Sequence, residues 1–163
     1  MNSKLEPASI TKIMTAILAI ENCDLNDTVT VPYEAISNIP SGYSIVPLQT
    51  DEQITVDQLL RVLMVHSAND AANVLAFHID GSISAFAERM NAKLSALGLH
   101  DSHFTNPSGQ HDENHYSTAH DIALLLQYCM KNSTFKNYAS LKSCHLSATN
   151  KSDERSFENT NPM

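Results

Sequence analysis

The sequence is poor in the residue types that mark several common classes of protein. It has no tryptophan, four glycines, three cysteines, and only ten lysines and arginines among 163 residues. With a formal net charge of −8 it offers no basic face for phosphate groups, so we expect no nucleic-acid partner. Cys23, Cys129 and Cys144 show no CxxC spacing, so neither a zinc knuckle nor a disulfide framework is indicated.

Long hydrophobic runs are also missing. The apolar stretch over residues 10–20 contains Thr11, Lys12 and Thr15 and is shorter than the ~18 residues that a membrane span needs. No charged segment followed by an apolar one opens the chain, so we expect neither a signal peptide nor a membrane segment in this sequence. The length and the 42% apolar content are typical of one globular domain, or of part of one.

What the sequence does contain is helical periodicity. Apolar side chains recur every three or four positions and predict helices over residues 10–20, 55–65, 70–79, 84–97 and 119–130. Short strands are predicted at residues 28–31 and 144–148, and a long irregular loop at residues 99–116. Thr55 with Gln58 predicts a capping box, Asp70 is expected to cap the next helix, and Ser117 or Thr118 the last one. The chain is therefore predicted to be mainly α.

One pair of residues in the first helix carries chemistry. In Pro7-Ala8-Ser9-Ile10-Thr11-Lys12, Ser9 and Lys12 lie one helical turn apart and face the same way, so the amine can reach the hydroxyl. They are a nucleophile and its possible base if burial or a cationic neighbour lowers the pKa of the amine enough to leave it neutral. The SxxK spacing recurs at residues 133–136, where polar neighbours predict an exposed turn or a helix cap.

A second polar group, Ser67-Ala68-Asn69, interrupts the apolar face between two predicted buried helices. Its side chains are therefore expected in a protected cleft. Taken alone, Ser67 and Asn69 are typical of residues that cap the following helix. Together with Ser9 and Lys12, they are predicted to belong to a site.

The two segments resemble the first two signatures of the serine D-alanyl-D-alanine carboxypeptidases, the low-molecular-weight penicillin-binding proteins of the peptidase S11 family. The likeness continues at residues 86–91, 97–99, 104–107 and 115–121, and so covers nearly the whole chain. It implies that residues 1–163 are an incomplete catalytic domain. This domain would be the helical part of the serine DD-peptidase and β-lactamase-like α/β fold, with the strands of the central sheet largely missing.

The resemblance also implies a role for each site residue. Ser9 would attack the carbonyl between the terminal D-alanines of a peptidoglycan stem peptide, and its backbone N–H would be one of two oxyanion donors. Lys12 would be the base, Ser67 would relay a proton to the leaving amine, and Asn69 would bind the substrate amide and hold Lys12. β-Lactam antibiotics would trap Ser9. The family needs no metal or other cofactor and acts outside the cytoplasm, in the bacterial cell envelope.

Two departures from the family pattern are visible. No Lys-Thr-Gly motif occurs, although in the family it binds the substrate carboxylate and its strand supplies the second oxyanion donor. Residues 159–163 resemble the segment that leads into that strand, and Met1 precedes Ser9 by only eight residues, where the family has two strands. We therefore expect low turnover and self-association through exposed apolar surface. The alternative is a truncated, non-catalytic relative that acts as a binding or interaction module.

Two other hypotheses are weaker. The histidines of the irregular loop and the start of the next helix, with two acidic neighbours, are metal-ligand types in a spacing that matches no established motif: His100, His103, His111, His115, His120, Asp112 and Glu113. We therefore expect no metal site. An unrelated helical interaction module would leave two ordered motifs unexplained.

Overall fold

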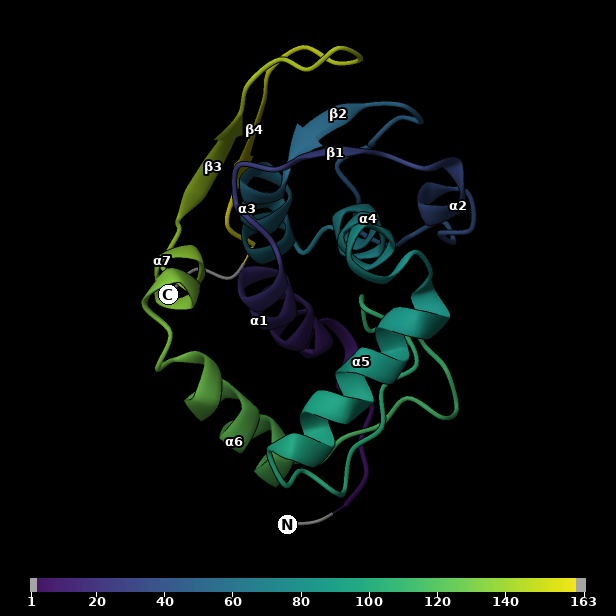
Figure 1. Cartoon of the computed structure of the whole chain (residues 1–163), viewed down its shortest axis with the longest axis vertical. Helices are drawn as coiled ribbons and strands as arrows, with labels where there is room; N and C mark the ends of the chain where they lie inside the picture. Colours follow the sequence, from purple (N-terminus) through teal and green to yellow (C-terminus); the bar gives the residue numbers. More distant parts are fainter. Residues whose placement is uncertain (1–2, 161–163) are drawn as a thin grey trace.

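Helices dominate the computed structural model, which describes residues 3–160 (Figure 1). The helical elements in chain order are η1 (Ala8–Thr11), α1 (Lys12–Asn22), α2 (Tyr33–Ile36), α3 (Val56–His66), α4 (Asn69–Asp80), α5 (Ile83–Ala96), α6 (Ala119–Cys129) and α7 (Ser133–Ala139). Two antiparallel strand pairs accompany them, β1 (Thr28–Thr30) with β2 (Gln53–Thr55) and β3 (Ser143–Leu146) with β4 (Arg155–Glu158). The prediction of a mainly α chain is confirmed.

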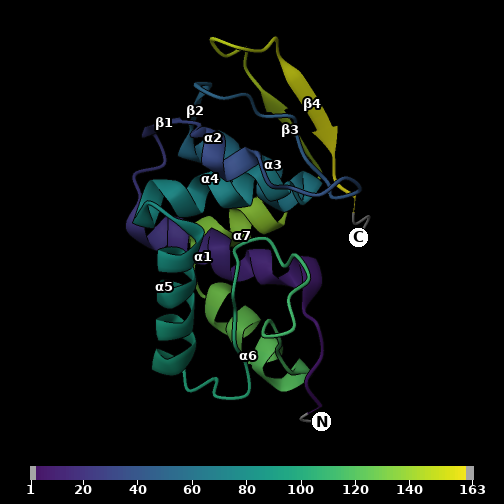
Figure 2. The same cartoon turned by 90° about the vertical axis from the view of Figure 1, so that its right-hand side faces the viewer.

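Helix α1 is the centre of the core. It packs against α3, α4, α5, α6 and α7, and its Met14, Ala16 and Ile17 are completely buried. Figures 1 and 2 show α3 and α4 on one side of α1 and α6 on the other. Because the helix is apolar on nearly all faces, burying it is the arrangement that removes most apolar surface from water. The residues at its first turn are thereby held from several sides.

Two irregular features frame this bundle. The predicted long loop joins α5 to α6 and is fastened by two isolated bridges, Leu5 with Ser117 and His103 with Tyr116 (Figure 2). The β3–β4 hairpin lies against α3, where the ring of Phe157 packs 4.7 Å from that of His66. The first bridge thus joins residues 112 positions apart just before η1, and the ring contact joins residues 91 positions apart at the end of α3.

Most predicted helix ends agree with the structure. Thr55 and Gln58 form both hydrogen bonds of a capping box at the start of α3. Thr118 caps α6 by accepting the N–H of Asp121 at 3.1 Å. The predicted strand at residues 28–31 corresponds to β1, and the one at residues 144–148 to β3, which begins one residue earlier and ends at Leu146.

Three predictions about local structure are wrong or incomplete. Asp70 is not a cap: Ala68 precedes α4, and the buried Asp70 carboxylate instead accepts the backbone N–H groups of Val46 and Leu48, in the segment between α2 and β2. Residues 133–136 are neither an exposed turn nor only a cap, because they begin α7 and bury Phe135 in the core. Helix α2 and strands β2 and β4 were not predicted, and residues 161–163 of the segment expected to lead into a further strand lie outside the described residues.

Several large apolar side chains remain in contact with water. Leu5 and Tyr33 are 61% and 62% exposed, and Ile10, Leu124 and Met130 are each at least 39% exposed. The expected self-association through such surface stays a prediction. Within residues 3–160, no helix is long and apolar enough to cross a membrane.

Candidate active site

The nucleophile candidate lies on an exposed, strained turn. Pro7 precedes η1, and Ala8 has a positive φ of 46°, a backbone conformation that residues other than glycine rarely adopt. Ser9, which follows, is exposed, whereas the next turn of the same helix is deep in the protein. Strain of this kind persists where the surroundings hold it, and it concentrates at functional sites.

Lys12 is the buried partner of Ser9. Its side chain is 3% exposed, and its Nζ lies 3.3 Å from Ser9 Oγ and donates to the carbonyl of Ser108 at 2.7 Å. Burial disfavours the charged ammonium and lowers the pKa of Lys12 from 10.5 to about 8. The amine of Lys12 thus loses its proton more readily than that of an exposed lysine, as the role of a base for Ser9 requires.

The irregular loop between α5 and α6 packs against the helical turn that carries Ser9 and Lys12. Thr15, one turn after Lys12, donates its hydroxyl to Pro107 O at 2.6 Å. A Cβ on Gly109, whose φ is +83°, would lie 1.8 Å from the carbonyl oxygen of Ala8. Only glycine allows the loop backbone to approach the nucleophile turn this closely. Asn106 Oδ1 shapes the loop by accepting the N–H of Gly109 at 2.8 Å.

Ser67 stands on the opposite wall of the same cavity. It ends α3 with φ 56° and ψ 40°, the left-handed conformation, and it is the second strained non-glycine residue at this site. The cavity has a volume of about 440 Å³ and is lined by Ser9, Ile10, Lys12, Ile13, Leu63, Met64, Ser67, Asn159 and Thr160. The structure thus brings three of the four predicted site residues together.

Asn69 lies beside this cavity and is not part of its lining. Its side-chain amide donates to the carbonyl of Ser44 at 2.9 Å, and its backbone N–H donates to the same oxygen at 2.8 Å. The Ser44 hydroxyl in turn donates to His66 O. In this structure Asn69 therefore fixes the loop that contains Ser44, while the Lys12 amine is held by Ser108 and Ser9.

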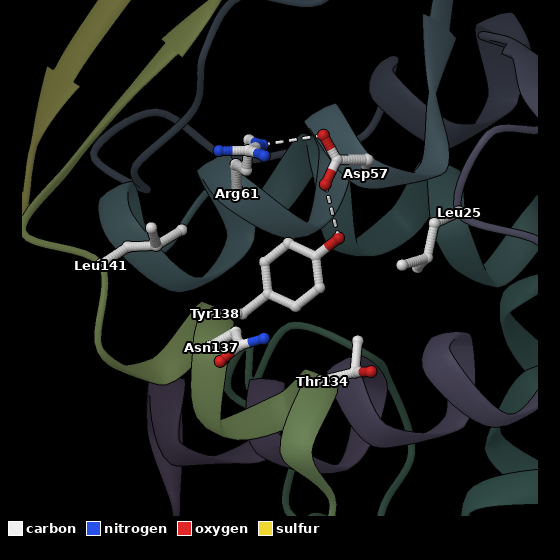
Figure 3. A pocket seen from close by; sticks show the side chains of 7 residues that line it. All are labelled: Leu25, Asp57, Arg61, Thr134, Asn137, Tyr138 and Leu141. Atoms are coloured by element: carbon white, nitrogen blue, oxygen red, sulfur yellow. Dashed lines mark hydrogen bonds and ion pairs between the residues drawn. The ribbon is translucent and has the colours of Figure 1, made fainter.

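A second cavity, of about 290 Å³, lies away from these residues, between α3 and α7 (Figure 3). Figure 3 shows Arg61, Asp57 and Tyr138 turned toward one another there. Arg61 Nε and the Tyr138 hydroxyl donate to the two carboxylate oxygens of Asp57 at 2.7 and 2.6 Å. Burial and this carboxylate raise the pKa of Tyr138. Arg61, Asp57 and Tyr138 are hydrogen-bonded to one another, so we assign these three residues a structural role.

The loop histidines have separate partners. His103 Nδ1 lies 2.7 Å from Asn114 O, His111 contacts Glu6, and His115 contacts Thr11. Among residues 3–160 no group of three or more histidine, cysteine, aspartate or glutamate side chains is arranged to hold a metal ion.

Sequence reasoning missed two parts of the site. Ser108 acts through its main-chain carbonyl, which no side-chain pattern reveals, and His115 was considered as a metal-ligand type and as part of the family likeness but not as a partner of the first helix. The Asn-Pro-Ser-Gly sequence at residues 106–109 was the available signal, since Asn, Pro and Gly together predict a tight turn.

Comparison with known proteins agrees with the geometry. The family model of the D-alanyl-D-alanine carboxypeptidases, Peptidase S11, matches residues 1–163. DacF, a D-alanyl-D-alanine carboxypeptidase of Bacillus subtilis, is 38% identical over 135 residues, which are 80% of this chain and 34% of that protein. DacB2 of Mycobacterium tuberculosis is 35% identical over 131 residues, which are 79% of this chain and 44% of that protein.

Solved structures show the same fold. Penicillin binding protein 6B from Escherichia coli aligns with a TM-score of 0.87 at 30% identity, covering 98% of this chain and 51% of that one. A DD-transpeptidase from Streptomyces aligns with a TM-score of 0.89 at 30% identity, covering 98% of this chain and 66% of that one. The chain thus corresponds to the helical part of a longer fold. It spans less than half of the length of DacF and of DacB2. The match over its whole length shows that it belongs to the peptidase S11 family of D-alanyl-D-alanine carboxypeptidases.

Proposed function

We propose that residues 1–163 are an incomplete catalytic domain of a serine-type D-alanyl-D-alanine carboxypeptidase. Its substrate would be a peptidoglycan stem peptide ending in D-Ala-D-Ala, met outside the cytoplasm in the bacterial cell envelope. One observation carries the proposal: the Lys12 amine lies 3.3 Å from the Ser9 hydroxyl, at the base of a cavity open to solvent. Family membership supplies the substrate class.

The first step is acylation of Ser9. The neutral Lys12 amine accepts the hydroxyl proton as Ser9 Oγ attacks the carbonyl carbon between the two D-alanines. The C–N bond then breaks, the departing amine takes up a proton, and an ester remains on Ser9. Burial contributes by lowering the pKa of Lys12 to about 8, close to the pH at which a base works best.

Ser67, on the wall opposite Ser9, is proposed to assist proton transfer. Ser67 faces the cavity and is proposed to pass the proton from Lys12 to the leaving amine. Water then attacks the ester with the same groups acting in reverse, which releases the shortened peptide. Asn69 is proposed to bind the substrate amide, for which its side chain must add a contact to the one it makes with Ser44 O.

The oxyanion that forms during attack needs hydrogen-bond donors. Ser9 lies in the first turn of its helix, where backbone N–H groups lack intrahelical acceptors, so its own N–H is the proposed donor. The sequence contains no Lys-Thr-Gly, whose strand supplies the second donor and the carboxylate clamp in the family. Loss of one donor alone costs about 3 kcal/mol of transition-state stabilisation. We therefore expect slow turnover by this chain.

Trapping of Ser9 by a β-lactam tests the proposal. The purified chain is incubated with benzylpenicillin and its intact mass is measured, with Ser9→Ala and Lys12→Ala as variants and Ser133→Ala, from the second SxxK segment, as matched control. The expected result is a covalent adduct on the wild type and on Ser133→Ala that is lost in Ser9→Ala. A folded wild type without an adduct would instead favour the non-catalytic relative, a binding or interaction module.

A further inference from the structure

A buried histidine behind the nucleophile turn has no part in the chemistry proposed above. His115 belongs to the loop between α5 and α6, is 3% exposed, and stacks on Phe104 with ring centroids 5.0 Å apart. Its Nε2 lies 2.7 Å from Thr11 Oγ1, and its Nδ1 accepts the backbone N–H of Thr105 at 2.9 Å. Both ring nitrogens are therefore committed to the protein.

These contacts fix the tautomer of the ring. Burial lowers the pKa of His115 to about 4, so the imidazole is neutral at physiological pH. Because Nδ1 accepts a hydrogen bond from Thr105, the single proton resides on Nε2 and is donated to Thr11 Oγ1. The stacked ring thus presents one donor in a fixed direction.

Thr11 accepts this hydrogen bond from His115 and connects the ring to the proposed site. It lies between Ser9 and Lys12 in the sequence, and its side chain is completely buried. A contact that fixes Thr11 fixes the turn against the loop, and it thereby holds Lys12 in place beside the carbonyl of Ser108, where its Nζ reaches Ser9 Oγ. The turn also begins at the strained Ala8, a conformation that must be held from outside.

We infer that His115 is a positioning residue for the nucleophile turn and acts through its hydrogen bond to Thr11. The inference rests on the proposed function, because the groups being positioned are the proposed nucleophile and base. The same loop makes three further contacts with this segment: Pro107 with Thr15, Ser108 with Lys12, and Gly109 with Ala8. His115 adds a fourth contact, to Thr11, which lies between Ser9 and Lys12.

Two substitutions separate the contacts of the ring. In His115→Gln the amide nitrogen can occupy the place of Nε2 and still donate to Thr11. In His115→Asn the shorter side chain reaches only the place of Nδ1, so the bond to Thr11 is lost. We expect His115→Asn and Thr11→Val each to slow acylation of Ser9 by benzylpenicillin by about tenfold or more, because small displacements of reacting groups are costly. His115→Gln is expected within about threefold of the wild type.

The double variant and a matched control sharpen this test. If the two residues act through one bond, His115→Asn combined with Thr11→Val acylates no more slowly than the slower single variant. His103→Asn changes a histidine of the same loop that contacts Asn114 and Tyr116, and it is expected to acylate at the wild-type rate. Equal rates for His115→Asn, His115→Gln and the wild type, all folded, would overturn the inference.

A readout without turnover separates this inference from the proposed function. The pKa of Lys12 is followed by NMR through its ¹³Cε shift in labelled protein. Release of the turn admits water, so in His115→Asn and Thr11→Val the pKa is expected to rise from about 8 toward 10.5, while His115→Gln keeps the wild-type value. If the wild type forms no adduct but these shifts appear, the proposed function fails and the positioning role stands. An unchanged Lys12 pKa in the folded His115→Asn variant contradicts the positioning role.

Discussion

The two walls of the cavity are held by different kinds of interaction. On the nucleophile wall, Thr15 and Lys12 donate to backbone carbonyls of the loop between α5 and α6, Thr11 accepts from His115 of that loop, and Gly109 packs against Ala8. The buried His115 there is neutral because burial lowers its pKa to about 4. This wall allows a lysine to sit among uncharged groups, which is the condition for a neutral amine.

The wall that carries Ser67 depends on buried charges. Asp70 accepts the N–H groups of Val46 and Leu48 and so fixes the loop whose Ser44 binds Asn69. Arg155 of the hairpin donates to Val46 O and pairs with Glu52, whose side chain is completely buried. Charges near Ser67 and Asn69 do not change the hydroxyl and amide groups that these residues present. A carboxylate near Lys12, in contrast, would raise the pKa of its amine.

Removing the buried carboxylate of Glu52 is expected to give the largest loss of stability. In Glu52→Ala, Arg155 keeps a charge that is largely buried and has lost its partner, which costs about 3–5 kcal/mol of unfolding free energy. Urea unfolding measures the change. Arg61→Ala is the matched control: its ion pair with Asp57 is about a third exposed on both sides, and such pairs contribute less than about 1 kcal/mol. Equal losses in the two variants would contradict the account of this wall.

A methyl group on Gly109 is expected to disrupt the nucleophile wall. In Gly109→Ala the new Cβ would lie 1.8 Å from Ala8 O, so the loop or the turn must shift. We expect a loss of about 2–3 kcal/mol from overpacking and the positive φ, with strongly slowed acylation of Ser9. Gly42→Ala, at a similar positive φ in open space, is the control for backbone strain alone. Normal acylation by folded Gly109→Ala would show that the close approach has no part in positioning.

Truncation of Asp70 is expected to have the smallest effect of the three. Asp70→Ala leaves the N–H groups of Val46 and Leu48 without their acceptor in buried surroundings, which costs about 2 kcal/mol. Thermal unfolding measures this loss. Because burial raises the pKa of Asp70, the folded state holds a proton more strongly than the unfolded chain, and the contribution of this group to stability falls as pH rises above about 3.8. The loss in Asp70→Ala should therefore be smaller at pH 7 than at pH 4.

Local sequence signals predicted the elements that carry the site. The period of apolar residues predicted α1, α3 and α4, and the capping box located the start of α3. Ser9 and Lys12 were predicted to meet because they belong to one helix. Ser67 was placed in a cleft because a polar residue between buried helices requires one.

The rest depends on contacts between distant segments. Lys12 and Ser108 are 96 positions apart, and Thr11 and His115 are 104 apart, so neither contact follows from local spacing. Asp70 was misread as a cap because the backbone N–H groups that donate to its carboxylate, those of Val46 and Leu48, lie more than twenty positions away. The burial of Phe135 likewise followed from packing of α7 onto α1 and α3, which the polar composition of residues 133–136 concealed.

The pH dependence of Ser9 acylation tests the central claim, that buried Lys12 acts as a neutral base. The rate of adduct formation with benzylpenicillin is measured by intact mass from pH 5 to pH 10. Because only the neutral amine accepts the serine proton, the rate should rise with pH to a plateau with a midpoint near 8, the pKa to which burial lowers Lys12. Lys12→Ala should show little acylation at any pH. A rate that is still rising steeply between pH 9 and pH 10, or one that Lys12→Ala retains in full, would contradict the account.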